Sequence, residues 1–199
     1  MALVKYNNRS ILNVTALDSI PSGGMNLITT NTITSGVSSS SFTSGIDSTY
    51  DTYLFKFINL HPASTQKFQV NFRDGGSDFD ATKTTTHFGA YHRENGASSG
   101  LAYEDGRDLA EGTGYASISD DNNTDNDHAV NGEMYLFSPA STTFTKHFIA
   151  RTRVEATFTT DGFVAGYANV TAAIDGVDFK FASGNIDSGV IKMYGLSKS

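Results

Sequence analysis

The chain has 199 residues, no cysteine and a formal net charge of −7 at pH 7. Without cysteine it has neither disulfide bonds nor a thiol nucleophile, and its acidic balance argues against a nucleic-acid-binding protein, which normally carries a basic face. No apolar stretch approaches the ~20 residues of a membrane-spanning helix, so we expect no membrane insertion, and the apolar run at the N-terminus is too short for a signal peptide.

Residues 1–24 form the first predicted unit, a weakly patterned arm. Ile11, Val14 and Leu17 would form one short helical stripe that ends before Pro21. We predict that this arm attaches the protein or makes oligomer contacts. A mobile terminus is the alternative, because terminal segments stay disordered unless other parts of the structure hold them. Residues 25–199 form the second predicted unit, a single domain that is long enough to bury a core.

Alternating apolar and polar residues predict strands throughout the second unit. Aromatic residues make up 12% of the chain, and together with β-branched residues they favour pleated, half-buried strands. The alternation is strictest in residues 67–73, where Phe68, Val70 and Phe72 fall on one face. Turn signals recur about every 8–12 residues, so we predict an all-β, antiparallel β-sandwich. The expected strands are residues 25–34, 50–58, 67–73, 87–92, 134–137, 144–150, 153–159, 163–170, 177–181 and 190–194.

Three polar segments are interpreted as turns. Residues 74–80 predict a hairpin turn, with a second cation site as the alternative. In residues 179–196, two alternating runs flank a Gly-Asn-Ile-Asp-Ser-Gly segment, which predicts an antiparallel hairpin that closes the domain. Residues 42–48 resemble residues 181–188, and we expect the same turn chemistry at two strand junctions; a duplicated half-domain is the alternative.

The strand pattern breaks down between residues 96 and 131, where residues 104–111 are either one helical turn or an irregular loop. An acidic loop follows, with Asp121, Asn123, Asp125 and Asp127 at alternate positions. Calcium takes six to eight oxygen ligands from such side chains, so these residues are a candidate calcium site. The loop is not an EF-hand, because Asn126 and Gly132 stand where that motif needs glycine and glutamate. A solvated surface loop is the alternative.

Aromatic and polar residues in and beside this loop-rich middle are candidates for binding a glycan or a receptor. They are Tyr91, His92, Arg93, Tyr103 and Tyr115. Aromatic rings stack on sugars, and polar side chains bond to hydroxyl groups; the alternative is that these residues serve core or interface packing. No cysteine nucleophile and no zinc-ligand spacing is present. We therefore expect no catalytic residues and no enzyme, and calcium is the one candidate cofactor.

Several segments resemble small β-sandwich structural proteins of tailed bacteriophages, especially phages of marine bacteria. Residues 48–63 are similar to their first long strand, with a Tyr-Asp-x-Tyr entry and an Asn-x-x-Pro-Ala corner. The resemblance spans about residues 40–196 and implies a jelly-roll-like sandwich, often in trimers. It carries over no catalytic residue. Its other motifs are residues 74–80, 136–142, 146–149 and 179–196.

The resemblance implies a non-enzymatic virion structural protein that is displayed on the particle surface, of the tail-fibre or receptor-binding type. Capsid decoration or cement is the alternative placement, and a stand-alone carbohydrate-binding module or small hydrolase is a further one. The expected partners are the chain itself, as a homotrimer, other phage virion proteins and host surface glycan. The protein would be assembled in the host cytoplasm. Long loops on a rigid scaffold usually carry recognition, so residues 93–130 would face outward.

Overall fold

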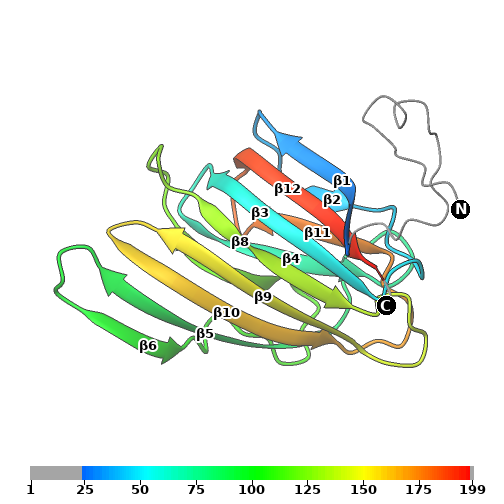
Figure 1. Cartoon of the computed structure of the whole chain (residues 1–199). Coiled ribbons are helices and arrows are strands. Elements are labelled where there is room, and N and C mark those ends of the chain that lie inside the picture. The colour runs from blue at the N-terminus through cyan, green and yellow to red at the C-terminus, as the bar shows by residue number, and fades with distance from the viewer. Residues whose placement is uncertain (1–23, 198–199) are drawn as a thin grey trace, which may run out of the picture.

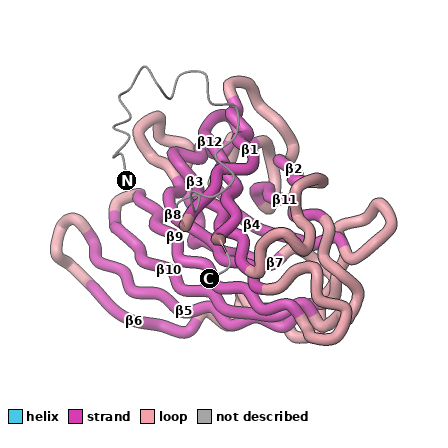
Figure 2. Tube along the Cα trace, turned by 45° about the vertical axis from the view of Figure 1, so that its right-hand side comes forward, coloured by secondary structure: helices cyan, strands magenta, loops and turns pink. Residues whose placement is uncertain are grey.

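A computed structural model describes residues 24–197, which form two antiparallel β-sheets packed face to face (Figure 1). All regular structure in this range is strand (Figure 2). Among these residues no helix is long and apolar enough to cross a membrane. The predicted arm lies outside the described residues except for Gly24, which directly precedes the first strand.

The large sheet has eight strands and the small sheet has four. The order of the large sheet is β1 (Met25–Ile33), β12 (Ile186–Leu196), β3 (Thr52–Pro62), β8 (Val130–Phe137), β9 (Lys146–Glu155), β10 (Phe158–Ala168), β5 (Lys83–Arg93) and β6 (Ser99–Tyr103). The order of the small sheet is β2 (Ser40–Phe42), β11 (Gly176–Phe181), β4 (Gln66–Arg73) and β7 (Ala116–Asn122). The predicted all-β antiparallel sandwich is confirmed, and its jelly-roll connectivity stays a prediction.

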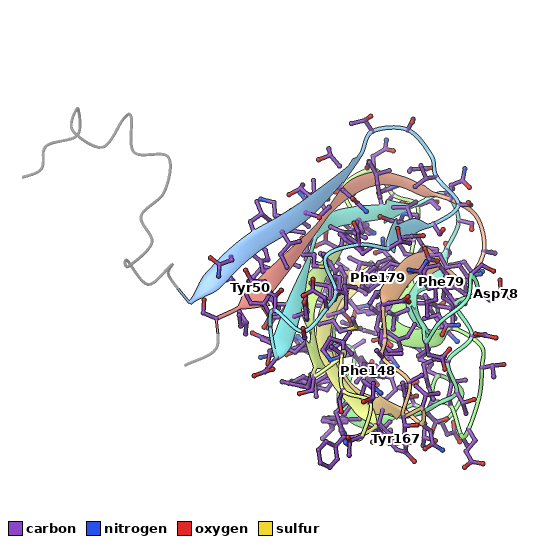
Figure 3. All side chains as sticks on the ribbon, turned by 90° about the vertical axis from the view of Figure 1, so that its right-hand side faces the viewer. Tyr50, Asp78, Phe79, Phe148, Tyr167 and Phe179 are labelled. Atoms are coloured by element: carbon purple, nitrogen blue, oxygen red, sulfur yellow. The ribbon has the colours of Figure 1, made fainter. Side chains whose placement is uncertain are left out.

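The core lies between the two sheets and is rich in phenylalanine. Phe68, Val70 and Phe72 of β4 are fully buried, as the alternation in the sequence predicts. The Phe179 ring of β11 lies 5.1 Å from Phe57 and 5.2 Å from Phe55, both of β3, in edge-to-face contacts. Phe148 and Phe179 both point into the space between the layers (Figure 3). Such ring pairs add stability beyond the area that they bury, and here they join the two sheets.

The predicted C-terminal hairpin is wrong. β11 belongs to the small sheet, where it pairs with β2 and β4, whereas β12 belongs to the large sheet, where it pairs with β1 and β3. The segment between them therefore crosses from one layer to the other. Residues 74–80 also cross between sheets, because β4 and β5 do not pair, so that predicted hairpin turn is wrong as well. Turn chemistry is local, and it is the same whether the next strand pairs with its predecessor or faces it across the core.

The repeated segment marks two equivalent junctions. Residues 42–48 lead from β2 in the small sheet toward β3 in the large sheet, and residues 181–188 lead from β11 in the small sheet to β12 in the large sheet. Gly45 and Gly184 have φ angles of 78° and 74°, a left-handed conformation that glycine adopts without strain. The prediction of one turn chemistry at two strand junctions is confirmed.

Strand boundaries in the second half differ from the prediction. The sequence pattern predicts two strands at residues 144–150 and 153–159, but β9 runs without a break from Lys146 to Glu155. Its apparent gap contains Thr152, a buried polar residue whose hydroxyl donates to the carbonyl oxygen of Ile118 at 2.6 Å. The middle of the chain also contains β6 and β7, which the sequence pattern missed. Residues 104–111 form no helix.

One end of the large sheet extends past the small sheet. The last four residues of β5, from Ala90 to Arg93, are exposed whichever face they point to. β7, at the edge of the small sheet, packs over β9, β10 and β5 but leaves these residues uncovered. Figure 1 shows the ends of β5 and β6 projecting away from the rest of the molecule. An open recess results where the inner face of β5 and β10 emerges from beneath β7.

Candidate ligand-binding cleft

A cleft of about 250 Å³ occupies this recess and is lined by both aromatic and charged side chains. β5 and β10 provide one wall, because Tyr91 pairs with Thr160 and Arg93 pairs with Phe158, so that all four side chains share the inner face. The other wall comes from β7 and from the loop that follows β6. The lining residues are Tyr91, Arg93, Glu104, Arg107, Asp120, Asp121, Phe158 and Thr160.

Arg107 organises the charged wall of the cleft. Its guanidinium contacts Asp120, lies 3.4 Å from the Asp121 carboxylate through Nη2, and lies 3.6 Å from Glu104 Oε2 through Nε. The Arg107 side chain is only 18% exposed. A short turn holds it in place, since the Arg107 amide donates to the Glu104 carbonyl and the Glu104 amide donates to the His87 carbonyl. One cation thus holds three carboxylates in a fixed arrangement.

The aromatic wall is more open to solvent. The Tyr91 side chain remains 38% exposed, and the Arg93 guanidinium lies 6.0 Å from the centre of the Phe158 ring, within the range of a cation–π contact. The cleft therefore offers flat apolar rings beside fixed hydrogen-bonding groups. With two arginines and three carboxylates among its lining residues, its formal charge is −1.

The structure brings together two of the five predicted glycan or receptor residues, Tyr91 and Arg93. His92 lies between them in the strand, and therefore points to the opposite face. Tyr103 pairs with Phe88 on that opposite face, and its hydroxyl donates to Asp108 at 2.5 Å. This hydrogen bond raises the pKa of Tyr103.

Tyr115 lies in a different setting, beside the small sheet. Its hydroxyl donates to Asp178 Oδ2 at 2.8 Å, and the ammonium group of Lys180 lies 4.2 Å from the centre of its ring. Burial, followed by the hydrogen bond to Asp178, raises the pKa of Tyr115. The Ser41 hydroxyl also donates to Asp178. These contacts hold Tyr115 outside the cleft, and its role in binding a glycan or a receptor stays a prediction.

Five cleft residues were missed as candidates in the sequence: Glu104, Arg107, Asp120, Phe158 and Thr160. Phe158 and Thr160 are set opposite Arg93 and Tyr91 by the register of β10 against β5, and no local pattern contains that register. Glu104 and Arg107, three positions apart, are a local signal for a turn with paired charges. That signal does not show that the pair faces Asp120 on another sheet.

A buried histidine, His87, lies close to this cluster. The residue is fully buried on the core side of β5, and neither ring nitrogen has a hydrogen-bond partner among the described residues. Burial, followed by the nearby charges of Arg107 and Lys67, lowers the pKa of His87 to about 4, whereas Asp108 acts in the opposite direction. His87 is therefore a neutral imidazole at physiological pH.

The candidate calcium residues are divided between two places. Asp121 faces Arg107 in the cleft, whereas the other three surround His128. Asn123 Oδ1 lies 2.5 Å from Nδ1 of His128, and Asp125 and Asp127 each approach a ring nitrogen to 3.8 Å. Within residues 24–197, no group of three or more His, Cys, Asp or Glu side chains is arranged to hold a metal ion. Calcium binding by this loop stays a prediction.

The protein is thus a β-sandwich with an open recess, and this recess combines aromatic rings and fixed charges. No protein-family model, no curated protein and no solved structure matches the chain.

Proposed function

We propose that this chain is a non-enzymatic recognition protein of a bacteriophage virion, of the tail-fibre or receptor-binding type, and that the cleft binds a surface glycan. The observation that carries the glycan-binding part is the joining of Tyr91 and Phe158 with Arg93 and the Arg107 cluster in one recess. The placement on a virion is supported by the resemblance of residues 40–196 to phage structural modules.

The chemistry of the cleft suits a sugar. The C–H face of a pyranose ring is apolar and packs on an exposed ring such as Tyr91, while hydroxyl groups need donors and acceptors that are already in place. Arg107 fixes the Glu104 and Asp121 carboxylates as acceptors, and Arg93 supplies donors. Because the lining carries a formal charge of −1, neutral or amino sugars are the preferred class over polyanionic glycans.

The same arrangement supports binding over hydrolysis. A glycosidase needs one carboxyl group as an acid and a second as a nucleophile or base. In this cleft Glu104, Asp120 and Asp121 all contact the Arg107 guanidinium. All three carboxylates therefore serve as partners of one cation, and none is set apart to act as the acid.

The test is binding of defined neutral, amino and acidic oligosaccharides to the full chain on an array, followed by calorimetry of any that bind. Tyr91→Ala should weaken binding at least tenfold, because a stacked aromatic contact is lost. Tyr103→Ala is the matched control, since its ring lies on the opposite face, and it should bind as the wild type does. Absence of binding, or equal loss in both variants, would contradict the assignment of the cleft. Turnover of a bound glycan that Glu104→Gln abolishes would contradict the non-enzymatic role.

A further inference from the structure

The outer face of the large sheet carries a continuous row of apolar and aromatic side chains. From β1 to β9, the residues of the row are direct partners on neighbouring strands. Between β9 and β10 the row shifts by two residues, and direct partners then continue it across β5 to β6 at the edge of the sheet. Figure 1 is viewed onto this face, with the small sheet behind it. The row is Leu27, Tyr194, Leu54, Tyr135 and Ile149, and then Phe163, Phe88 and Tyr103.

Most of the exposed large apolar side chains in the described range lie on this face. Of nine such residues, only Tyr91 in the cleft and Phe144 in the β8–β9 loop lie elsewhere. The seven on the face are Met25, Leu27, Ile58, Phe88, Leu101, Tyr103 and Ile149. A monomer seldom exposes a contiguous apolar surface of this extent, and such a surface usually marks an interface.

The row is already well ordered within one chain. Leu54 is only 3% exposed although it is not part of the core between the sheets. Phe88 and Phe163 are stacked 5.2 Å apart, and the Arg151 guanidinium lies 4.7 Å from the centre of the Phe163 ring. Beside these rings is a hollow of about 320 Å³ whose walls include Ile149 and Tyr135. A preformed surface loses little side-chain entropy when a partner covers it.

The size of the face fits a stable protein interface. Eight strands about 4.8 Å apart span roughly 34 Å, and strands of about ten residues are roughly 33 Å long, which gives roughly 1,000 Å². A standard interface buries about 800 Å² on each partner. The face is therefore large enough without any contribution from the cleft, which opens on the other side of β5.

The charges on the face favour a second copy of the same chain as the partner. Four cations and three anions point outward, so that the face is almost neutral, although the whole chain has 14 cations and 21 anions. Two central pairs are already neutralised, Lys56 with Glu133 at 3.3 Å and Arg151 with Asp161 at 2.6 Å. The outward charged residues are Lys56, Arg151, Arg153, Lys192, Glu133, Glu155 and Asp161.

Two copies that meet through this face would keep their acidic surfaces apart and would bury no unpaired charge at the centre. We propose that the outer face of the large sheet packs against the same face of a second copy, forming a dimer with two-fold symmetry. An interface between identical patches closes on itself. This assembly differs from the homotrimer that the resemblance implies, and it leaves both glycan clefts open.

The test is the molar mass of the full chain by light scattering between about 1 and 100 µM. The wild type should have twice the 21.3 kDa monomer mass. Ile149→Glu should be monomeric, because it places a charge at the centre of the face, and it should still fold because the Ile149 side chain is 47% exposed. Phe144→Glu is the matched control. It changes an apolar residue that is 72% exposed and lies off the face, and it should remain a dimer.

A wild-type monomer, a wild-type trimer, or a dimer that persists in Ile149→Glu would each overturn the proposal. Deletion of residues 1–23 tests whether the N-terminal segment, instead of a second copy, covers the outer face of the large sheet. If the full chain is a monomer and the deletion increases amide exchange in β8 and β9, the N-terminal segment covers the face instead. Failure of glycan binding leaves this result unaffected, because the two surfaces lie on opposite sides of β5.

Discussion

The ammonium group of Lys83, on β5 of the large sheet, lies 2.5 Å from the side-chain oxygen of Asn71, on β4 of the small sheet. It also donates to the Ala81 carbonyl oxygen at 2.6 Å. The Lys83 side chain is fully buried. Burial lowers its pKa to about 8, although Asp80 and Asp74 act in the opposite direction. A buried cation thus joins the two layers at the edge of a core that is otherwise held by phenylalanine.

Replacing Lys83 by Met should destabilise the fold by about 2–4 kcal/mol. The substitution keeps most of the side-chain volume, but it leaves the Ala81 carbonyl oxygen without its donor and removes one of the two donors to the Asn71 side-chain oxygen, which keeps only the Phe72 amide. Urea denaturation at pH 7 measures the change. Lys67→Met serves as the control, because the Lys67 side chain is half-buried and makes no side-chain hydrogen bond or ion pair within residues 24–197; less than about 0.5 kcal/mol is expected. Equal stability of the two variants would show that Lys83 does not hold the sheets together.

His87 should make the fold sensitive to mild acid. In the unfolded chain the pKa of its imidazole is 6.5, and in the folded chain burial lowers the pKa to about 4. Between these two pH values the unfolded chain binds a proton that the folded chain does not bind. The free energy of unfolding therefore falls by about 3 kcal/mol from pH 6.5 to pH 4, and this residue has no effect above pH 6.5.

The variant His87→Leu isolates this contribution. Its free energy of unfolding should decline less than that of the wild type between pH 6.5 and pH 4, with the difference approaching about 3 kcal/mol. His92→Leu is the control, because His92 is exposed on the same strand, and it should keep the pH profile of the wild type. Parallel profiles for the wild type and His87→Leu would contradict the prediction.

Arg107→Met should loosen the charged wall of the cleft. Glu104, Asp120 and Asp121 would then face one another without a cation, which should cost about 1–3 kcal/mol at pH 7. The loss should shrink in acid, where the carboxylates take up protons and no longer repel each other. Thermal unfolding at pH 7 and pH 4 measures both effects.

Arg153→Met provides the comparison for Arg107→Met. Arg153 also contacts a carboxylate, Asp161 at 3.5 Å, but its side chain is 63% exposed, and exposed pairs contribute little. Its variant should lose under about 1 kcal/mol at either pH. If Arg107→Met loses no more than this, its ion cluster is not structural.

Gly184→Ala should weaken the crossing from β11 to β12. The backbone at Gly184 is left-handed, and a Cβ atom would lie 2.6 Å from the Ser64 hydroxyl oxygen, so a loss of about 1–2 kcal/mol is expected. Gly114→Ala adds the same methyl group in open space without a left-handed φ angle and should be nearly neutral. Urea denaturation of the two variants checks the difference, and a neutral Gly184→Ala would contradict it.

Side-chain alternation by itself determined where most strands lie. The pattern of Phe68, Val70 and Phe72 predicts both a strand and its buried face, because the period of two is a property of the local backbone. The turn residues around Gly45 and Gly184 likewise predict that the chain changes direction at both places. These features depend only on neighbours in the sequence, so they are visible without the tertiary structure.

Only the tertiary structure decided which sheet each strand joins and which side chains meet. β11 and β12 have the alternation and turn of a hairpin, yet they face each other across the core, because Phe179 packs on Phe57 of the opposite sheet. In the same way, Tyr91 meets Phe158 and Arg107 through the register of β10 and the position of β7. Sheet assignment and register are set by long-range packing, in which residues far apart in the chain compete for one core, and no local pattern contains that competition.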